Sequence, residues 1–497
     1  LRQTPFRFDA QPYTGSFWAK GSRITGMVAR LTDGDTVLAQ ADVAAPSENW
    51  AAYRFQLTPS AATLDGTLEL AFLGEGTVVV DQVSLMGQDA LDTGGYRPDL
   101  LQAAADLRPP VIRWPGGCFA SAYRWKYGIG PQHQRIAHPI VQWDDQDVNA
   151  YGTDEFIRMC HLIGAEPILV INVGIGSACG AGAIEDPYPS EAELLQDTLD
   201  WIEYCNGPAT STWGAVRAAN GHPEPYHVKY WEIDNETWSK GSGWYADRVN
   251  QFAPLMKQAD PGIKLIAVGG GGFDQNWNQD ILDRCAAVID YISVHSYFNP
   301  AEYDTIPARY EDFLVALGEM IAASANPDLE IYNSEWNAQS IDLRTGLFAG
   351  GILNVFERQG DVFTMGGPAL MYRHLSASAW NNAFVNFDHT GSFRAPNYIV
   401  MKLWRDHYAP WRISAAGDSG PLNLVATRSE DGNRVVVKAV NPSTGPVHTR
   451  LELPEGTSVA GATLRQVSDA SLLEVNSLTD PERIRVEPGA ATVVGQG

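Results

Sequence analysis

Two segments of the chain place a glutamate just after an apolar run and between asparagine and tryptophan side chains. Residues 230–238 (YWEIDNETW) contain Glu236, and residues 331–337 (IYNSEWN) contain Glu335. If both runs are strands of one parallel barrel, their carboxyl ends open onto the same face. Two carboxylates on one cleft suit glycosidic bond cleavage, in which one protonates the leaving oxygen and the other stabilises or attacks the anomeric carbon. The adjacent indoles would supply an apolar surface for sugar stacking.

A simpler explanation exists for each glutamate alone, because a strand-end carboxylate often only caps a helix or faces water. Two matching contexts on separate strands favour chemistry. Glu232 and Asp234 are alternatives to Glu236, since the two-residue period of a strand would place all three on one side. We favour Glu236 because it comes last and follows Asn235, whose amide can bind a sugar hydroxyl. Asp234 is then expected to support the site from behind.

Polar residues end two further apolar runs. Arg113 precedes Pro-Gly-Gly, a sequence that permits a tight turn with close backbone approach. It would bind a sugar hydroxyl or orient a carboxylate, or else form a buried structural ion pair. His295 and Tyr297 share one strand face, so both would point into the cleft, although a strand-end histidine is commonly structural. Cys118 is a weak candidate for a reactive thiol, because small buried packing is the commoner role of cysteine.

The elements that must position these residues follow a β-then-α rhythm from about residue 98. A helix is predicted over 98–107 with proline near its first turn, and further helices over 153–163, from Ser190 to about residue 205, and over 310–324. Barrel strands are predicted at 111–114, 167–173, 228–233, 264–268, 288–294, 329–333 and near 369. This alternation indicates an α/β fold, a (β/α)8 TIM-type barrel. Seven strands are found where eight are needed, so one is missed by the pattern or contributed by sequence outside this chain.

Strand-rich segments flank the predicted barrel. Short runs separated by Gly, Asp, Pro and Ser before residue 90 predict a β jelly roll of the carbohydrate-binding-module kind. After about residue 410, two runs around Asp431-Gly432 predict a hairpin within a C-terminal β-sandwich. We therefore divide the chain into a jelly roll over 1–92, a catalytic barrel over 93–405 and a β-sandwich over 406–497.

Composition excludes several classes of function. The chain has 497 residues and a net charge of −24, which argues against nucleic acid or an anionic membrane as partner. It contains no apolar run long enough to cross a membrane. Five dispersed cysteines without a CxxC pair make a disulfide framework or a zinc site improbable, and the histidines lack metal-ligand spacing. We expect a carbohydrate partner, no metal and no cofactor; a homo-oligomer is left open.

The chain resembles the family 51 glycoside hydrolases, most of which are α-L-arabinofuranosidases. The matching segments occur in the family's order between about residues 110 and 340: RWPGGCF (113–119), GIGP (128–131), NVG (172–174), WIEYCN (201–206), KYWEIDNETW (229–238), DYISVHSY (290–297) and SEWN (334–337).

The resemblance implies a retaining mechanism, with Glu236 as acid/base and Glu335 as nucleophile. It also matches Asn235 to a sugar-binding amide, Arg113 to a sugar-pocket arginine and Tyr297 to a tyrosine near the nucleophile. With these three, the candidate substrate-binding residues are Cys118, Asn172, His295 and Trp336. Many members have asparagine where this chain has Cys118, so one sugar hydrogen bond would be lost or replaced. Members usually also have a first barrel strand with a pocket glutamate before the jelly roll, and this chain starts within the predicted jelly roll.

The segment 372–386 departs from the arabinofuranosidase pattern, so the substrate is less determined than the reaction. Three functions remain open: an exo-acting enzyme that releases terminal arabinofuranose from plant polysaccharide, an endo-β-glucanase or xylanase with the same carboxylates, and a non-catalytic carbohydrate-binding protein. The presence of both glutamates argues against the third. A secreted or periplasmic location is favoured over the cytoplasm.

Overall fold

The computed structural model describes residues 1–139, 146–176, 179, 190–453 and 457–493. The chain divides into two compact units. Unit 1 comprises residues 1–104, 374–376 and 386–392; unit 2 comprises residues 105–373, 377–385 and 393–497. The domain boundaries placed at residues 92 and 405 from the sequence remain predictions.

Unit 1 is built on an antiparallel sheet with two very long strands. Its strands are β1 (Arg2–Phe8), β2 (Tyr13–Asp33), β3 (Thr36–Val43), β4 (Ala51–Leu57) and β5 (Thr63–Gly87). They pair in the order β1-β5-β2-β3, with β4 also paired to β2. Every second side chain from Tyr13 to Ala19 is buried, as the strand period requires, and Phe8, Phe17 and Phe55 belong to the core. The jelly-roll assignment stays a prediction.

Unit 2 contains a nearly closed parallel barrel, which confirms the predicted TIM-type fold with flanking sheets. Its seven strands are β6 (Val111–Trp114), β9 (Glu166–Ile171), β10 (Tyr230–Ile233), β11 (Lys264–Gly271), β12 (Tyr291–Phe298), β13 (Glu330–Ala338) and β14 (Phe363–Pro368). They are hydrogen-bonded in the order β14-β13-β12-β11-β10-β9-β6. Each strand lies near a run predicted from the sequence.

Apolar residues on both faces make these strands suitable for a parallel sheet covered by helices. Ile168, Ile266, Tyr332 and Met365 form a cluster of buried residues contributed by four of the strands. Strand β10 is in register with both neighbours, so that Glu232 lies opposite Val170 of β9 and Ile266 of β11. Parallel pairing therefore brings the carboxyl ends of the strands, and the residues that follow them, to one face.

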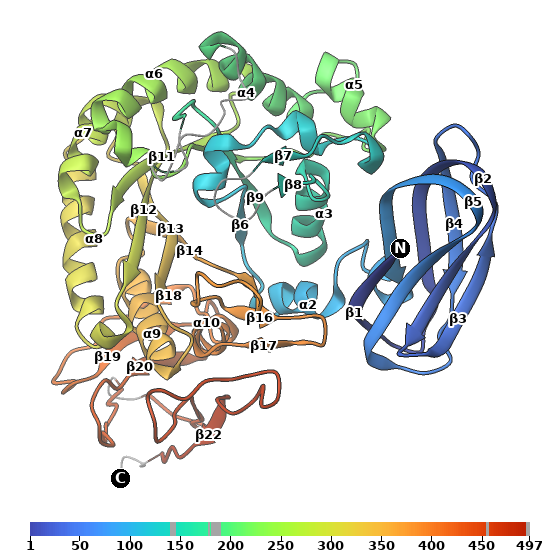
Figure 1. Cartoon of the computed structure of the whole chain (residues 1–497). Helices are drawn as coiled ribbons and strands as arrows, with labels where there is room; N and C mark the ends of the chain where they lie inside the picture. The colour runs from blue at the N-terminus through green and yellow to red at the C-terminus, as the bar shows by residue number, and fades with distance from the viewer. Residues whose placement is uncertain (140–145, 177–178, 180–189, 454–456, 494–497) are drawn as a thin grey trace. The chain divides into compact units, whose positions relative to one another are not determined.

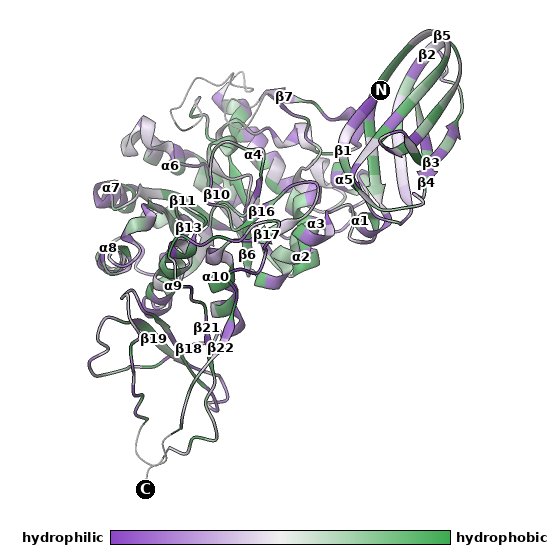
Figure 2. Cartoon of the chain, turned by 60° about the horizontal axis from the view of Figure 1, so that its bottom comes forward, coloured by the Kyte–Doolittle hydropathy of each residue, from purple (hydrophilic) through white to green (hydrophobic). Residues whose placement is uncertain are grey.

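Helices surround the barrel strands (Figure 1). The main ones are α3 (Thr153–Ile163), α4 (Glu191–Asn206), α5 (Thr212–Ala219), α6 (Ser242–Ala259), α7 (Gln275–Cys285), α8 (Ile306–Ala322), α9 (Leu343–Arg358) and α10 (Pro396–Asp406). Ser190 caps α4 by accepting a hydrogen bond from the Glu193 amide, as its sequence predicts. Helix α7 is largely hydrophilic along its length, which fits an outer position (Figure 2).

Shorter elements complete the chain. Those before β14 are the helices α1 (Gln88–Asp92) and α2 (Pro98–Leu107), the 3-10 turns η1 (Gly117–Ala122), η2 (Trp125–Gly128), η3 (Gln132–Gln134), η4 (Thr237–Lys240), η5 (Ala286–Val288) and η6 (Pro300–Glu302), and the strands β7 (His138–Pro139) and β8 (Gln146–Asp147). Later strands are β15 (Tyr372–His374), β16 (Val385–Phe387), β17 (Ser392–Arg394), β18 (Trp411–Arg412), β19 (Asn423–Arg428), β20 (Val435–Val440), β21 (Leu464–Gln466) and β22 (Glu487–Gly489).

The C-terminal strands form small antiparallel sheets beside the barrel helices. Strand β18 pairs with β19, β19 pairs with β20, and β21 pairs with β22. The β19–β20 connection includes Asp431-Gly432, with Gly432 at φ +74°, which confirms the predicted hairpin. None of the helices in the described ranges is long and apolar enough to cross a bilayer.

Truncation of Ile266 should destabilise the barrel. This side chain is fully buried between strands, so Ile266→Ala leaves a cavity and is expected to lower the free energy of unfolding by about 2–5 kcal/mol. Val315→Ala on the exposed face of α8 is the matched control and should change it by less than about 0.5 kcal/mol. Urea unfolding of both variants measures the difference, and equal effects would contradict this packing.

Candidate active site

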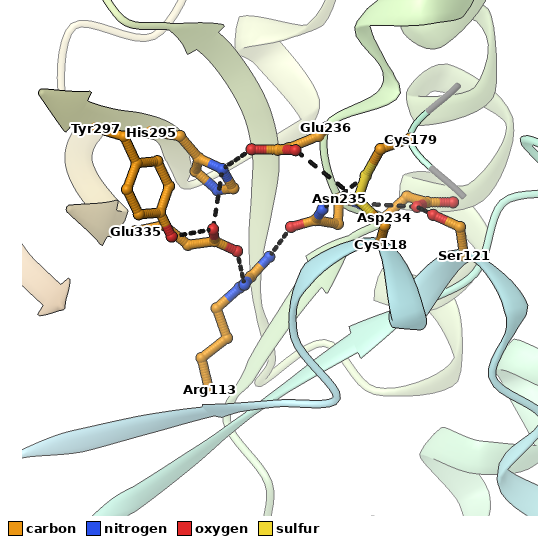
Figure 3. Close-up of a disulfide and its surroundings, with 10 residues drawn as sticks. All are labelled: Arg113, Cys118, Ser121, Cys179, Asp234, Asn235, Glu236, His295, Tyr297 and Glu335. Carbon is orange, nitrogen blue, oxygen red and sulfur yellow. Dashed lines mark hydrogen bonds and ion pairs between the residues drawn. A yellow bond between two sulfur atoms is a disulfide. The ribbon is translucent and has the colours of Figure 1, made fainter. Parts of the chain in front are cut away.

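Arg113 lies at the centre of the candidate site. It is the next-to-last residue of strand β6, near the carboxyl end of that strand. Its Nη1 donates to Glu335 Oε1 at 2.9 Å, and its Nη2 donates to Asn235 Oδ1 at 2.7 Å (Figure 3). Its Nε donates to Glu232. The Pro-Gly-Gly turn that follows gives this side chain room, because a Cβ on Gly116 would lie 3.3 Å from Nη1. Gly117 adopts φ +61°, a conformation that favours glycine.

The Arg113 guanidinium is a permanently charged group in a buried position. Burial opposes its charge, but the carboxylates of Glu232 and Glu335 outweigh burial and raise its pKa above the ordinary value. Glu232 is fully buried and also accepts a hydrogen bond from Ser293 at 2.9 Å. Arg113 therefore satisfies both expectations at once: it is a buried ion-pair partner and it orients a strand-end carboxylate.

Glu335 belongs to strand β13, and both of its carboxylate oxygens are held. Arg113 donates to Oε1, and the Tyr297 hydroxyl on β12 donates to Oε2 at 2.8 Å. Burial alone would raise the pKa of Glu335; the nearby charges of His295 and Arg113 and the Tyr297 hydroxyl outweigh it and lower that pKa below its usual value. The carboxylate is therefore held in its ionised form with a fixed orientation.

Glu236 follows the end of β10 on a turn with φ +43°. Its Oε1 is joined to His295 Nδ1 by a 2.7 Å hydrogen bond, and His295 Nδ1 also lies 3.6 Å from Glu335 Oε2. One carboxylate oxygen of Glu236, one ring nitrogen of His295 and one carboxylate oxygen of Glu335 all lie within 4.8 Å of one another. The Glu236 side chain is 21% exposed, against 9% for Glu335. The two glutamates thus meet, with Glu236 nearer the solvent.

His295 lies between the two carboxylates. Burial alone would lower its pKa, but the adjacent Glu335 and Glu236 outweigh burial and raise the pKa of the imidazole above its ordinary value. The two carboxyl groups therefore favour the charged form of the imidazole. The structure thus brings both His295 and Tyr297 next to Oε2 of Glu335.

The sequence predicted that Glu232, Asp234 and Glu236 point to the same side of one strand. This prediction is wrong for Asp234, because β10 ends at Ile233 and the regular alternation of side chains ends with it. Asp234 adopts φ +63°, and its carboxylate turns away from Arg113. It accepts hydrogen bonds of 2.7 Å each from Ser121 Oγ, the Val173 amide and the Asn235 amide. Burial raises the pKa of Asp234 to about 6, although these bonds oppose the rise. Asp234 therefore holds the backbone of the turn next to Glu236 and does not face the cleft, which agrees with the supporting role expected for it.

Cys118 is not a free thiol, which corrects the sequence interpretation. It forms a disulfide with Cys179, 61 residues away in the chain. An odd cysteine count without CxxC pairs gave no sign of this bond, because the two loops meet only through the barrel. Cys118 Sγ lies 3.9 Å from Glu236 Oε2, and Asn235 Nδ2 donates to Cys179 Sγ at 3.4 Å. The disulfide is therefore part of the wall beside Glu236.

Two other predicted binding residues have different surroundings. Asn172 follows β9 and is 7% exposed, and its Oδ1 accepts a hydrogen bond from the Gly174 amide at 2.7 Å. The Trp336 indole is 1% exposed and packs against Phe348, Phe356 and Phe384. Because a side chain of β13 alternates with its neighbour, Trp336 points into the core when Glu335 points into the cleft.

Trp380 is an aromatic residue near the site that the sequence interpretation did not single out. Its ring lies edge-on to Tyr297, with centroids 5.7 Å apart, and the residue is 40% exposed. The only sequence signal was its place in segment 372–386, which departs from the related pattern. An exposed indole next to the tyrosine that holds Glu335 is suited to contact a sugar ring.

Metal ligation is a second chemistry to weigh for these groups. Within the described residues, Glu236, His295 and Glu335 have suitable spacing, as do Cys118, Cys179 and Glu236. The two cysteines are joined as a disulfide, which removes the thiolates a metal would need. Both oxygens of Glu335 are occupied by Arg113 and Tyr297, and the Arg113 charge repels a cation. The donor set favours proton transfer and charge stabilisation.

Comparison with known families gives two adjoining matches. The profile described as "Alpha-L-arabinofuranosidase 1 domain" matches residues 103–313, and the profile described as "Alpha-L-arabinofuranosidase C-terminal domain" matches residues 321–497. The first match covers Arg113 and Glu236 and the second covers Glu335.

Individual proteins are also similar. A probable α-L-arabinofuranosidase C of Aspergillus terreus is 34% identical over 430 residues, which cover 74% of this chain and 80% of that protein. An extracellular exo-α-L-arabinofuranosidase of Streptomyces chartreusis is 27% identical over 91% of this chain and 54% of its own length. The solved GH51 α-L-arabinofuranosidase of Thermotoga petrophila is 27% identical, with a TM-score of 0.69 over 80% of this chain and 87% of that one.

Removal of the Tyr297 hydroxyl should shift the pH dependence of turnover. The hydroxyl helps to lower the pKa of Glu335, so Tyr297→Phe raises that pKa. An enzyme that needs the ionised form of Glu335 loses activity as the pH falls through the pKa of that carboxyl group. The acidic limb of kcat/KM against pH for an aryl glycoside should therefore move to higher pH.

Tyr303→Phe is the matched control, since the Tyr303 hydroxyl donates to the Pro442 carbonyl at 3.2 Å. It should leave the acidic limb in place. An acidic limb that stays unchanged in Tyr297→Phe would show that this hydrogen bond does not control the charge of Glu335.

Proposed function

Since this chain belongs to the family 51 α-L-arabinofuranosidases, we propose that it is an exo-acting, retaining glycoside hydrolase that releases terminal α-L-arabinofuranosyl residues from plant polysaccharides or oligosaccharides. The observation that carries the mechanism is the approach of Glu236 and Glu335, since one carboxylate oxygen of Glu236 lies within 4.8 Å of one carboxylate oxygen of Glu335. Retaining glycosidases hold their carboxyl groups about 5–5.5 Å apart, and inverting enzymes hold theirs about 6.5–9.5 Å apart to admit a water. The short separation supports retention.

Glu335 is the proposed nucleophile. Its ionised state is favoured by His295 and Arg113, and its orientation is fixed by hydrogen bonds from Arg113 and Tyr297. In the first step a Glu335 oxygen bonds to the anomeric carbon while the glycosidic C–O bond breaks, giving a covalent sugar ester. The leaving oxygen departs on the opposite side, toward the second carboxyl group.

Glu236 is the proposed acid/base. It gives its proton to the leaving oxygen in the first step, and in the second it removes a proton from the water that attacks the ester carbon. Its greater exposure suits a group that must meet both the leaving group and water. His295, hydrogen-bonded to Oε1 of Glu236, holds this carboxyl group in place and responds to its charge in each step.

Asn235 is the proposed contact for a hydroxyl of the bound sugar. Its Oδ1 is fixed by Arg113, whereas its Nδ2, among the residues that the structure describes, donates to a sulfur atom of the disulfide. Sulfur is a weak acceptor, so a sugar hydroxyl can replace it with a stronger hydrogen bond. The exposed indole of Trp380 would contact the same substrate from the side of Tyr297.

A secreted or periplasmic location is proposed with this function. The similar Streptomyces chartreusis protein is named extracellular. The Cys118–Cys179 disulfide agrees with this, because disulfides persist mainly in oxidising compartments. A polymeric plant substrate would also be met outside the cell.

Separate glutamine variants test the two roles. Glu335→Gln removes the nucleophile and should lower kcat for an aryl α-L-arabinofuranoside by at least about 10³-fold. Glu236→Gln should lower kcat/KM by about 10²–10⁴-fold for poor leaving groups and far less for good ones, which need no proton. Added azide needs no general base, so it should accelerate Glu236→Gln with good leaving groups and leave Glu335→Gln unchanged.

Glu319→Gln, an exposed change on α8, is the control and should keep full activity. If neither Glu236→Gln nor Glu335→Gln lowers turnover by more than tenfold, the catalytic assignment is wrong.

A substrate panel tests exo-action on arabinofuranosides. Aryl α-L-arabinofuranoside and arabinoxylan should release free arabinose, with little change in polymer viscosity, because only side residues are removed. Soluble β-glucan and unsubstituted xylan should stay intact. A rapid fall in viscosity of β-glucan or xylan without arabinose release would instead establish an endo-acting enzyme.

A further inference from the structure

The disulfide lies within the candidate site itself. Cys118 is the second residue of η1, directly after the Pro-Gly-Gly turn, and Cys179 belongs to the loop that follows β9. The two sulfur atoms contact consecutive residues of the β10 turn: Cys179 accepts a hydrogen bond from Asn235 and Cys118 lies 3.9 Å from a Glu236 oxygen (Figure 3). These two residues are the proposed sugar-binding amide and acid/base.

The turn that carries these residues depends on contacts from outside the strand. Strand β10 ends at Ile233, and both Asp234 and Glu236 adopt positive φ, at +63° and +43°. Non-glycine residues seldom adopt such angles, and the strain persists only where surrounding contacts determine it. The position of Glu236 is thus set by neighbouring loops, which must themselves be fixed.

The same two loops clamp Asp234. Ser121, three residues after Cys118 in η1, donates to one carboxylate oxygen, and the Val173 amide, after the end of β9, donates to the other. The Cys118–Cys179 disulfide covalently joins the segment that contains Ser121 to the segment that follows Val173, so it links the two donors that hold Asp234. Asp234 in turn accepts from the Asn235 amide, which extends the clamp to the turn itself.

We propose that the Cys118–Cys179 disulfide is a positioning element for Asn235 and Glu236, so that the proton-transfer part of catalysis requires the oxidised protein. This inference rests on the proposed function, because it assigns the disulfide to the acid/base half of that reaction. Glu335 is held by Arg113 and Tyr297 instead, and within the described part of the chain neither cysteine hydrogen-bonds to its carboxylate.

Chemical reduction breaks this covalent link. A dithiol such as dithiothreitol supplies two electrons and two protons, the S–S bond becomes two thiols, and the dithiol closes to its own cyclic disulfide. The two sulfur atoms then move apart to van der Waals distance, which displaces the wall beside Glu236. A thiol hydrogen also becomes available to the Glu236 carboxylate, where the disulfide offered none.

The test uses the full chain before and after treatment with dithiothreitol under native conditions. Reduction should lower kcat/KM for an arabinofuranoside with a poor leaving group, such as phenol, by at least about tenfold. It should lower kcat/KM much less for 2,4-dinitrophenol, which leaves without protonation. Released thiols, counted in parallel, should rise with the loss of activity, and reoxidation should restore it.

Cys118→Ser/Cys179→Ser should show the same leaving-group dependence without reductant and should not respond to it. Cys285→Ser is the matched control at a buried free cysteine outside the site, and it should behave as the parent protein. Near-UV circular dichroism reports whether each form keeps its packed fold. Ser121→Ala, which keeps the disulfide but removes one bond of the clamp, should give a smaller change of the same kind.

The outcomes separate this inference from the function on which it rests. If the oxidised protein does not hydrolyse arabinofuranosides, the proposed function fails. A second outcome is that the oxidised protein is active while reduction, with the fold kept, changes kcat/KM for neither substrate. In that case the disulfide is only structural and this inference is wrong. An equal loss for both leaving groups would also contradict it, because proton transfer would then not be the affected step.

Discussion

The buried guanidinium of Arg113 is the interaction on which the geometry of the site depends. It contacts Glu232, Asn235 and Glu335, which come from two different strands and one turn. A cation out of water needs such partners, and removal of one partner from a buried pair typically costs about 3–5 kcal/mol. The three acceptors and the arginine therefore hold one another in place, and the fixed orientation and charge of Glu335 follow from this arrangement.

The barrel makes this arrangement possible because its strand ends meet at one face. Strands β6, β10, β12 and β13 deliver Arg113, Glu236, His295 with Tyr297, and Glu335 from positions spread over more than 200 residues of the chain. The two glutamates are then treated differently by their surroundings. Glu335 is enclosed by donors that favour its charge, whereas Glu236 lies nearer the solvent beside a histidine and a disulfide. Different surroundings suit two carboxyl groups to two different roles.

The sequence predicted those parts of the structure that depend on local pattern. The helices over 98–107 and 153–163 and the strand over 111–114 have the predicted bounds, because apolar period, proline and glycine mark their ends. Both glutamates, His295 and Tyr297 were placed together by the rule that barrel strands end on one face. The direction of Asp234 could not be predicted, because its carboxylate is held by Ser121 and Val173, which are distant in the sequence and follow the strands β6 and β9. The Cys118–Cys179 bond and the core position of Trp336 likewise depend on contacts distant in sequence.

The central claim is that Glu335 forms a covalent sugar ester which Glu236 then helps to break. The anomeric configuration of the first product tests it most directly, because two displacements retain the configuration and one inverts it. With an aryl α-L-arabinofuranoside as donor and methanol as acceptor, proton NMR at early times should show methyl α-L-arabinofuranoside. Formation of the β-anomer instead would show a single displacement by the acceptor and would contradict the account.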